Sequence, residues 1–127
     1  MFDNVDPTGG FESLNTLYYE APELYDALYG TSEFDLAFWK KHAVSANGPV
    51  LELGCGSGRL TIPIAKDGIK ITGVDRALPM LKLAREKTKA AEVTVRLILD
   101  DIRAVDLMSR FKLIMASANL INECLTA

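Results

Sequence analysis

The sequence has 127 residues, of which 49% are hydrophobic and 24% charged, as in a single globular domain with a hydrophobic core. Its net charge of −3 argues against a nucleic-acid surface that relies on overall positive charge. No apolar run approaches the roughly 20 residues of a membrane-spanning helix, and the N-terminus lacks the basic and apolar regions of a secretory signal. The two cysteines follow no disulfide or zinc-site spacing, which favours a reducing, cytoplasmic location and no metal site.

The N-terminal part predicts a lead-in followed by two helices. Residues 1–21 are polar and contain glycine and proline, so we expect a flexible segment ahead of one domain over residues 22–127. Residues 22–29 are typical of a short helix, because proline is favoured in a first turn. A second helix is expected to have Ser32 as its N-cap and to end at Asn47.

After residue 48 the sequence alternates between apolar segments of strand length and segments of helical length. Such alternation with short connections predicts an α/β fold, a parallel sheet with helices on both faces. Pro63 lies inside one of the expected helices and predicts a local kink. The expected strands are 49–53, 69–74, 93–99 and 111–116, and the expected helices are 58–67 and 79–90.

The most informative segment joins the first of these strands to the next helix. It places glycine at every second position, as Gly54, Gly56 and Gly58. Without a Cβ the loop can turn tightly and approach a ligand, and the following helix points its free N–H groups at the same space. This chemistry suits nucleotide binding. The dinucleotide fingerprint would require a third glycine where this chain has Arg59, so the loop fits the pyrophosphate of NAD poorly.

The G-x-G-x-G spacing, with the acidic Glu52 two residues before it, resembles motif I of the class I S-adenosylmethionine (SAM)-dependent methyltransferases. The resemblance covers about residues 18–122. It implies a Rossmann-like sheet, SAM as cofactor, S-adenosylhomocysteine as product, and direct methyl transfer to a nitrogen, oxygen or carbon atom. The family sheet has the order 3-2-1-4-5-7-6, and this chain stops just after its fourth strand. We therefore expect about four strands in the order 3-2-1-4, preceded by N-terminal helices, with the family's strands 5–7 missing.

Two further acidic residues follow strands in the positions that adenosine binding requires. Asp75 ends the second strand, 21 residues after Gly54, where ribose hydroxyls are bound. In the resemblance, Asp101 after the third strand accepts a hydrogen bond from the adenine amino group, and Ile102 packs on the ring. An ordinary turn formed by Asp100 and Asp101 is the alternative.

The remaining cofactor residues have less specific signals. Glu52 interrupts an apolar strand and needs a partner, either the ammonium group of SAM, as the resemblance implies, or the loop backbone. A catalytic cysteine would need a general base, and the sequence indicates none near Cys55. We therefore interpret Cys55 as a small residue that fits between two glycines. The predicted cofactor-binding set is Glu52, Gly54, Cys55, Gly56, Gly58, Asp75, Arg76, Asp101, Ile102 and Ser117.

The acceptor side is less defined. Asn119 follows the fourth strand, where ligands of parallel sheets bind, and no catalytic signature accompanies it. Tyr25 and Tyr29 lie in a segment that resembles the Tyr-Asp-x-Leu-Tyr segment of many small-molecule methyltransferases, and simple helix packing explains them equally well. The hypothesis is a methyltransferase acting on a small molecule; the alternatives are a non-catalytic SAM-binding or S-adenosylhomocysteine-binding fragment and an NAD-binding domain. Self-association through the exposed fourth strand is also expected.

Overall fold

The structure of the protein is a computed structural model, and it describes residues 20–29 and 33–117. Most of the predicted lead-in, the predicted N-cap Ser32 and the candidate Asn119 lie outside these residues. No helix in the described residues is both long and apolar enough to cross a membrane.

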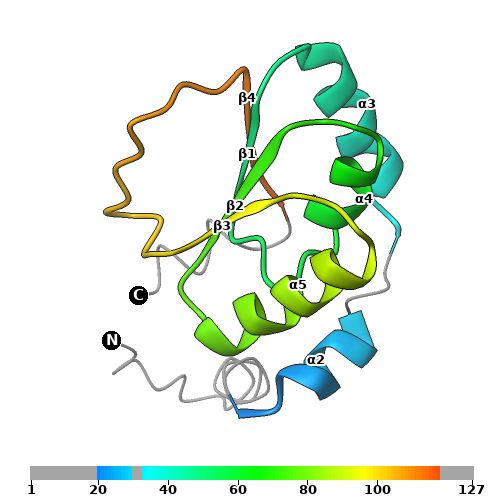
Figure 1. Ribbon diagram of the computed structural model, residues 1–127, viewed down its shortest axis with the longest axis vertical. Helices are drawn as coiled ribbons and strands as arrows, with labels where there is room; N and C mark the ends of the chain where they lie inside the picture. The colour runs from blue at the N-terminus through cyan, green and yellow to red at the C-terminus, as the bar shows by residue number, and fades with distance from the viewer. Residues whose placement is uncertain (1–19, 30–32, 118–127) are drawn as a thin grey trace.

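The centre of the fold is a four-stranded sheet (Figure 1). The order is β3-β2-β1-β4, and all three pairings are parallel, which confirms the predicted order. Because the strands are parallel, their carboxyl ends share one edge, the edge at which such sheets bind ligands. The strands are β1 (Val50–Leu53), β2 (Ile71–Asp75), β3 (Arg96–Leu99) and β4 (Leu113–Ala116).

Three helices cover one face of this sheet (Figure 1): α3 (Leu36–Ala46), α4 (Thr61–Lys66) and α5 (Leu78–Ala90). The prediction had helices on both faces. In the described residues the other face carries the connection from β3 to β4 instead. The steps from β1 to β2 and from β2 to β3 run in the same direction, and right-handed crossovers then put α4 and α5 on the same side.

The helix boundaries differ in part from those predicted. Helix α2 spans Pro22–Tyr29 as expected, and α3 ends at Ala46, because Asn47 caps it with a left-handed φ of 50°. Helix α3 begins at Leu36, later than the sequence predicted. Helix α4 also begins late, so Pro63 lies in its first turn, where a missing N–H costs little, and the argument for a kink no longer holds.

The core lies between the helices and the sheet. Leu60 and Ile64 from the α4 region pack against Val50, Ile71 and Met115 of three neighbouring strands. Strand residues alternate between faces, so Met115 faces this core while its neighbour points to the opposite side. The core therefore fixes the central strands and, with them, the loops at their carboxyl ends.

Candidate functional site

The glycine loop after β1 has the backbone that its sequence predicts. The φ angles of Gly54, Gly56 and Gly58 are 71°, 57° and 91°, a region that residues with a Cβ rarely adopt. At Gly58 an added Cβ would also lie 2.7 Å from Cδ1 of Ile62. The N–H groups of Gly54 and the next residue donate to the Val74 carbonyl, over 2.7 and 3.0 Å. The loop is thus fixed on the end of β2.

Asp75 connects this loop to the following helix. Its side chain is buried, with Oδ2 accepting from the Gly56 N–H and Oδ1 from the Ala77 N–H, each over 2.9 Å. The predicted ribose acceptor therefore also holds the loop and the start of α5. A carboxylate oxygen accepts up to two hydrogen bonds, so these two bonds do not by themselves exhaust its capacity.

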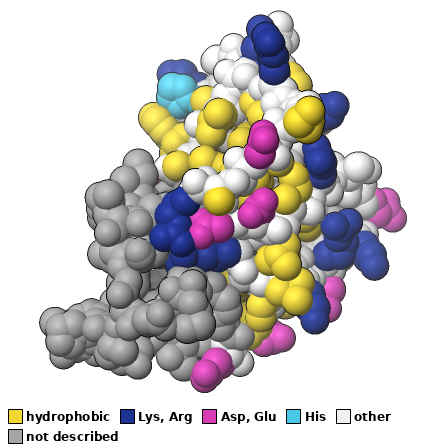
Figure 2. Space-filling model, turned by 90° about the vertical axis from the view of Figure 1, so that its left-hand side faces the viewer, with side chains coloured by type: hydrophobic (Ala, Val, Ile, Leu, Met, Phe, Trp, Pro, Cys, Tyr) yellow, Lys and Arg dark blue, Asp and Glu magenta, His cyan; other side chains and the backbone are white. Residues whose placement is uncertain are grey.

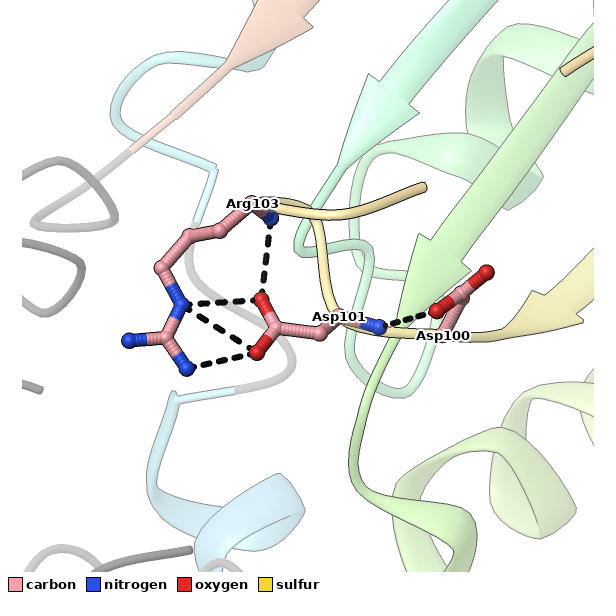
Figure 3. Close-up of polar contacts among 3 residues, drawn as sticks. All are labelled: Asp100, Asp101 and Arg103. Atoms are coloured by element: carbon pink, nitrogen blue, oxygen red, sulfur yellow. Dashed lines mark hydrogen bonds and ion pairs between the residues drawn. The ribbon is translucent and has the colours of Figure 1, made fainter. Parts of the chain in front are cut away.

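Asp101 lies at the end of β3, next in the sheet to Asp75, and Figure 3 shows its carboxylate paired with Arg103. Nε of Arg103 lies 3.0 and 3.1 Å from the two carboxylate oxygens, and Nη2 lies 2.5 Å from Oδ2. The Arg103 backbone N–H also donates to Oδ1, over 2.9 Å. These hydrogen bonds hold the pKa of Asp101 well below its usual range, and the nearby Arg76 lowers it slightly further.

The residues around Asp101 define a compact turn. Asp100 accepts the Asp101 N–H over 2.7 Å, and its own N–H donates to the Asp75 carbonyl. This is the turn role that the sequence left open for the acidic pair. Ile102 is half-buried beside it.

Glu52 is buried in β1 and has a partner that the sequence did not indicate. Oε1 of Glu52 accepts a hydrogen bond of 2.5 Å from the Thr61 hydroxyl at the start of α4, rather than one from the loop backbone. Burial raises the pKa of Glu52 from 4.5 to about 7, against the effects of Thr61, Arg59 and, more weakly, the Ser117 hydroxyl. Ser117, predicted beside the cofactor, thus lies close to Glu52.

Cys55 fills the space behind the loop. Its thiol is buried, and burial raises its pKa well above the usual range, which disfavours a reactive thiolate. A Cβ at Gly73 of β2 would lie 2.7 Å from Sγ of Cys55. The structure therefore supports the interpretation of Cys55 as a packing residue of the loop.

Arg59 follows the loop and was not predicted as a site residue. Its guanidinium pairs with Asp35 before α3 over 2.5 and 3.2 Å, and it lies 5.5 Å from the centre of the Phe34 ring. The hydrogen bond with Arg59 lowers the pKa of Asp35. Tyr25 of α2 acts electrostatically on Arg59, which puts this candidate tyrosine near the loop.

A second polar contact joins α2 to the loop. Oδ1 of Asp26 lies 2.5 Å from the Ser57 hydroxyl and 2.5 Å from Nζ of Lys87 on α5. The loop residues on either side of Gly58 are thus bound by acidic residues of the N-terminal helical part. Tyr29 ends α2, but the position of its side chain is not described.

The structure brings the predicted residues of the first three strand ends together at one edge of the sheet. Ser57, Arg59, Thr61 and Arg103 join them without having been predicted. A charged residue directly after the loop was the available signal for Arg59. In the described residues no group of three histidine, cysteine or acidic side chains is placed to hold a metal ion.

Comparison with known proteins identifies the family. Residues 50–126 match the family described as methyltransferase domain. A protein of Geobacillus sp. (strain WCH70) named as a methyltransferase is 30% identical over 109 residues, which is 86% of this chain and 42% of that protein. The ubiquinone biosynthesis O-methyltransferase of Nitrosococcus oceani is 32% identical over 84 residues, which is 65% of this chain and 36% of the relative. The chain thus spans less than half the length of these relatives.

A solved structure agrees with this assignment. The glycopeptide N-methyltransferase MtfA, in complex with SAM, is 30% identical and superimposes with a TM-score of 0.55. The similarity covers 66% of this chain and 38% of MtfA. Together with the sheet order and the glycine loop, the match over residues 50–126 shows that the chain belongs to the class I SAM-dependent methyltransferases.

Proposed function

We propose that this chain binds SAM at the carboxyl ends of β1, β2 and β3 and is the cofactor-binding part of a methyltransferase. The observation that carries the proposal is the bond between the Gly56 N–H and Asp75, which joins a three-glycine loop to the acidic residue of the next strand. The loop offers backbone without side chains, and the adjacent carboxylates offer acceptors for hydroxyl and amino groups.

The polar residues along the sheet edge fit the successive parts of SAM. Asp75 would accept from the ribose hydroxyls and Asp101 from the adenine amino group, with Ile102 against the ring. Glu52 and Ser117 lie together at the ends of β1 and β4, towards the methionine and methyl end. Arg76 follows Asp75 and adds positive charge near Asp101.

SAM, when bound, supplies a methyl group already activated on a sulfonium. The residues of this chain then have to bind, orient and desolvate the reactants, which is the main source of rate in such a transfer. The glycine loop is held for this purpose by its contacts to Asp26 of α2 and to Asp35 before α3. No residue of the chain is assigned a proton-transfer role.

We propose a small molecule as acceptor. The proposal is supported by the relatives named as a ubiquinone biosynthesis O-methyltransferase and a glycopeptide N-methyltransferase, whose names also leave the acceptor atom open between oxygen and nitrogen. Tyr25, near the loop, and Tyr29 at the end of α2 remain acceptor-side candidates. A reducing, cytoplasmic location is part of the same proposal, consistent with the free thiol of Cys55.

Thermal unfolding with SAM, S-adenosylhomocysteine and NAD tests the cofactor. A ligand at one hundred times its Kd adds about 2.7 kcal/mol to the free energy of unfolding, so the first two should raise the melting temperature clearly. Stabilisation by NAD alone would overturn the assignment. A methyl-transfer assay with small phenols and amines then separates an enzyme from a fragment that only binds SAM.

A further inference from the structure

In the pairing of Asp101 with Arg103, one arginine N–H is shared between both carboxylate oxygens. Three N–H groups of Arg103, its backbone N–H, Nε and Nη2, contact the carboxylate. Nε is shared between both oxygens, at 3.0 and 3.1 Å. A carboxylate has about four acceptor positions, and here each oxygen accepts two hydrogen bonds. An incoming donor can take one of the two positions that Nε shares, while Nε keeps its hydrogen bond to the other oxygen.

The contacts also fix the orientation of the carboxylate. Asp101 and Arg103 are held in one turn, because Asp100 accepts the Asp101 N–H and is itself bonded to the end of β2. The pair is partly exposed, with side-chain exposures of 34% and 40%, and exposed ion pairs contribute little to folding. A contribution to folding stability therefore explains the pairing of Asp101 with Arg103 poorly, and a role in ligand binding explains it better.

We propose that Arg103 is a positioning residue for base recognition: it fixes the direction of the Asp101 carboxylate, so that the acceptor position shared with Nε selects a base with an exocyclic amino group. The inference rests on the proposed SAM site. An aimed carboxylate accepts from the amino group of adenine and repels the carbonyl oxygen that hypoxanthine carries at the same place. Because the carboxylate is already oriented, binding loses less conformational freedom.

The test measures the affinities of S-adenosylhomocysteine and S-inosylhomocysteine by calorimetry for the wild type and five variants. Arg103→Ala should weaken S-adenosylhomocysteine about fivefold to tenfold, the effect of losing the orientation of one charge-assisted bond. It should weaken the inosyl ligand less, so selectivity falls. Arg103→Lys, which has no fork, should be intermediate. Arg85→Ala removes an arginine from the exposed surface of α5 and should change neither value.

Asp101→Ala completes the design. If Arg103 acts through Asp101, then Arg103→Ala should add nothing in the Asp101→Ala background. Unchanged affinity and selectivity in Arg103→Ala would overturn the inference, as would tighter binding, which would mean that Arg103 competes with the base. A wild-type chain that binds neither ligand would instead contradict the proposed function itself.

Discussion

The backbone N–H of Gly56 lies 2.9 Å from Oδ2 of Asp75, so the acidic residue at the end of β2 holds the glycine loop at the end of β1. The other oxygen of Asp75 accepts the Ala77 N–H at the start of α5. One carboxylate thus joins two strand ends and a helix. A residue predicted as a ligand contact is therefore also part of the framework that shapes the site.

Asp75→Ala should lower both stability and cofactor affinity. Two buried N–H groups lose their acceptor, which costs about 1–3 kcal/mol each where water cannot replace it. Asp75→Asn keeps one acceptor oxygen and should lie between the wild type and Asp75→Ala. Urea unfolding measures the loss, with the exposed Asp106→Ala as control.

The same variants test the ribose assignment. Asp75→Ala should weaken S-adenosylhomocysteine by more than Asp100→Ala, with Asp101→Ala between them, because only Asp75 is expected to bind two hydroxyls. Calorimetry on the three variants gives the order. Wild-type affinity in a folded Asp75→Ala protein would move the ribose site elsewhere.

The pKa of Glu52 makes stability depend on pH. Its folded pKa of about 7 lies above the usual 4.5, so the folded protein binds the proton more tightly than the unfolded chain. The stabilising contribution is fully present below about pH 4.5 and is lost as the pH rises through 7. Relative to Glu52→Gln, the wild type should lose about 3 kcal/mol of unfolding free energy across this interval.

Urea unfolding of both proteins at several pH values from 4.5 to 8 checks the effect. Thr61→Val removes the hydroxyl that stabilises the charged carboxylate, so it should raise the folded pKa of Glu52 and move the upper end of this interval to higher pH. If the free energy of unfolding depends on pH in the same way for the wild type and Glu52→Gln, the raised pKa of Glu52 is contradicted.

The sequence predicted the sheet because its signals are local. The apolar segments and the glycines with positive φ act through their own backbone, so the strand order, the loop and the acidic strand ends could be read in advance. The partners of those residues could not. Thr61 lies nine residues from Glu52, and Asp35 lies 24 residues from Arg59. Such contacts depend on how helices dock on the sheet, which neither spacing nor periodicity encodes.

Gly73→Ala should destabilise the protein through a collision between two strand ends. A Cβ there meets Sγ of Cys55 at 2.7 Å and its Cβ at 2.9 Å, inside a buried layer that cannot move easily. Overpacking of this kind costs about 1–3 kcal/mol.

A double-mutant cycle with Cys55 tests whether this collision causes the loss of stability. Cys55→Gly removes both atoms that collide, so Gly73→Ala should cost clearly less in that background when thermal or urea unfolding is measured. An equal cost in both backgrounds would show that another contact is responsible.

Asp35 and Arg59 should be coupled energetically. Their side chains are only 15% and 17% exposed and make two hydrogen bonds, so a double-mutant cycle with alanine should give a coupling of about 1–2 kcal/mol. The pKa of Asp35 is lowered, so this contribution is present above about pH 4 and is lost as the pH falls through the lowered value. The more exposed pair of Lys40 and Asp67 is the control, with an expected coupling of about 0.5 kcal/mol or less. Equal coupling energies for the two pairs would contradict a stabilising role of the Asp35–Arg59 pair beside the loop.

We also propose that the chain associates with itself through β4. Within the described residues β4 pairs only with β1, and Ile114 is 59% exposed on the sheet face opposite the core. Figure 2 views the molecule from the left-hand side of Figure 1, and hydrophobic side chains extend across the middle of this face. An apolar edge strand is a template for pairing with a second chain.

Sedimentation at low micromolar concentrations should therefore detect dimers or larger species of the 127-residue chain. Ile114→Lys should shift the equilibrium towards monomer, because a charge on this strand opposes both pairing and face-to-face contact. Leu28→Lys puts the same charge on an exposed leucine of α2, away from the sheet edge, and should leave the association unchanged. A monomeric wild type, or equal effects of the two lysines, would contradict association through β4.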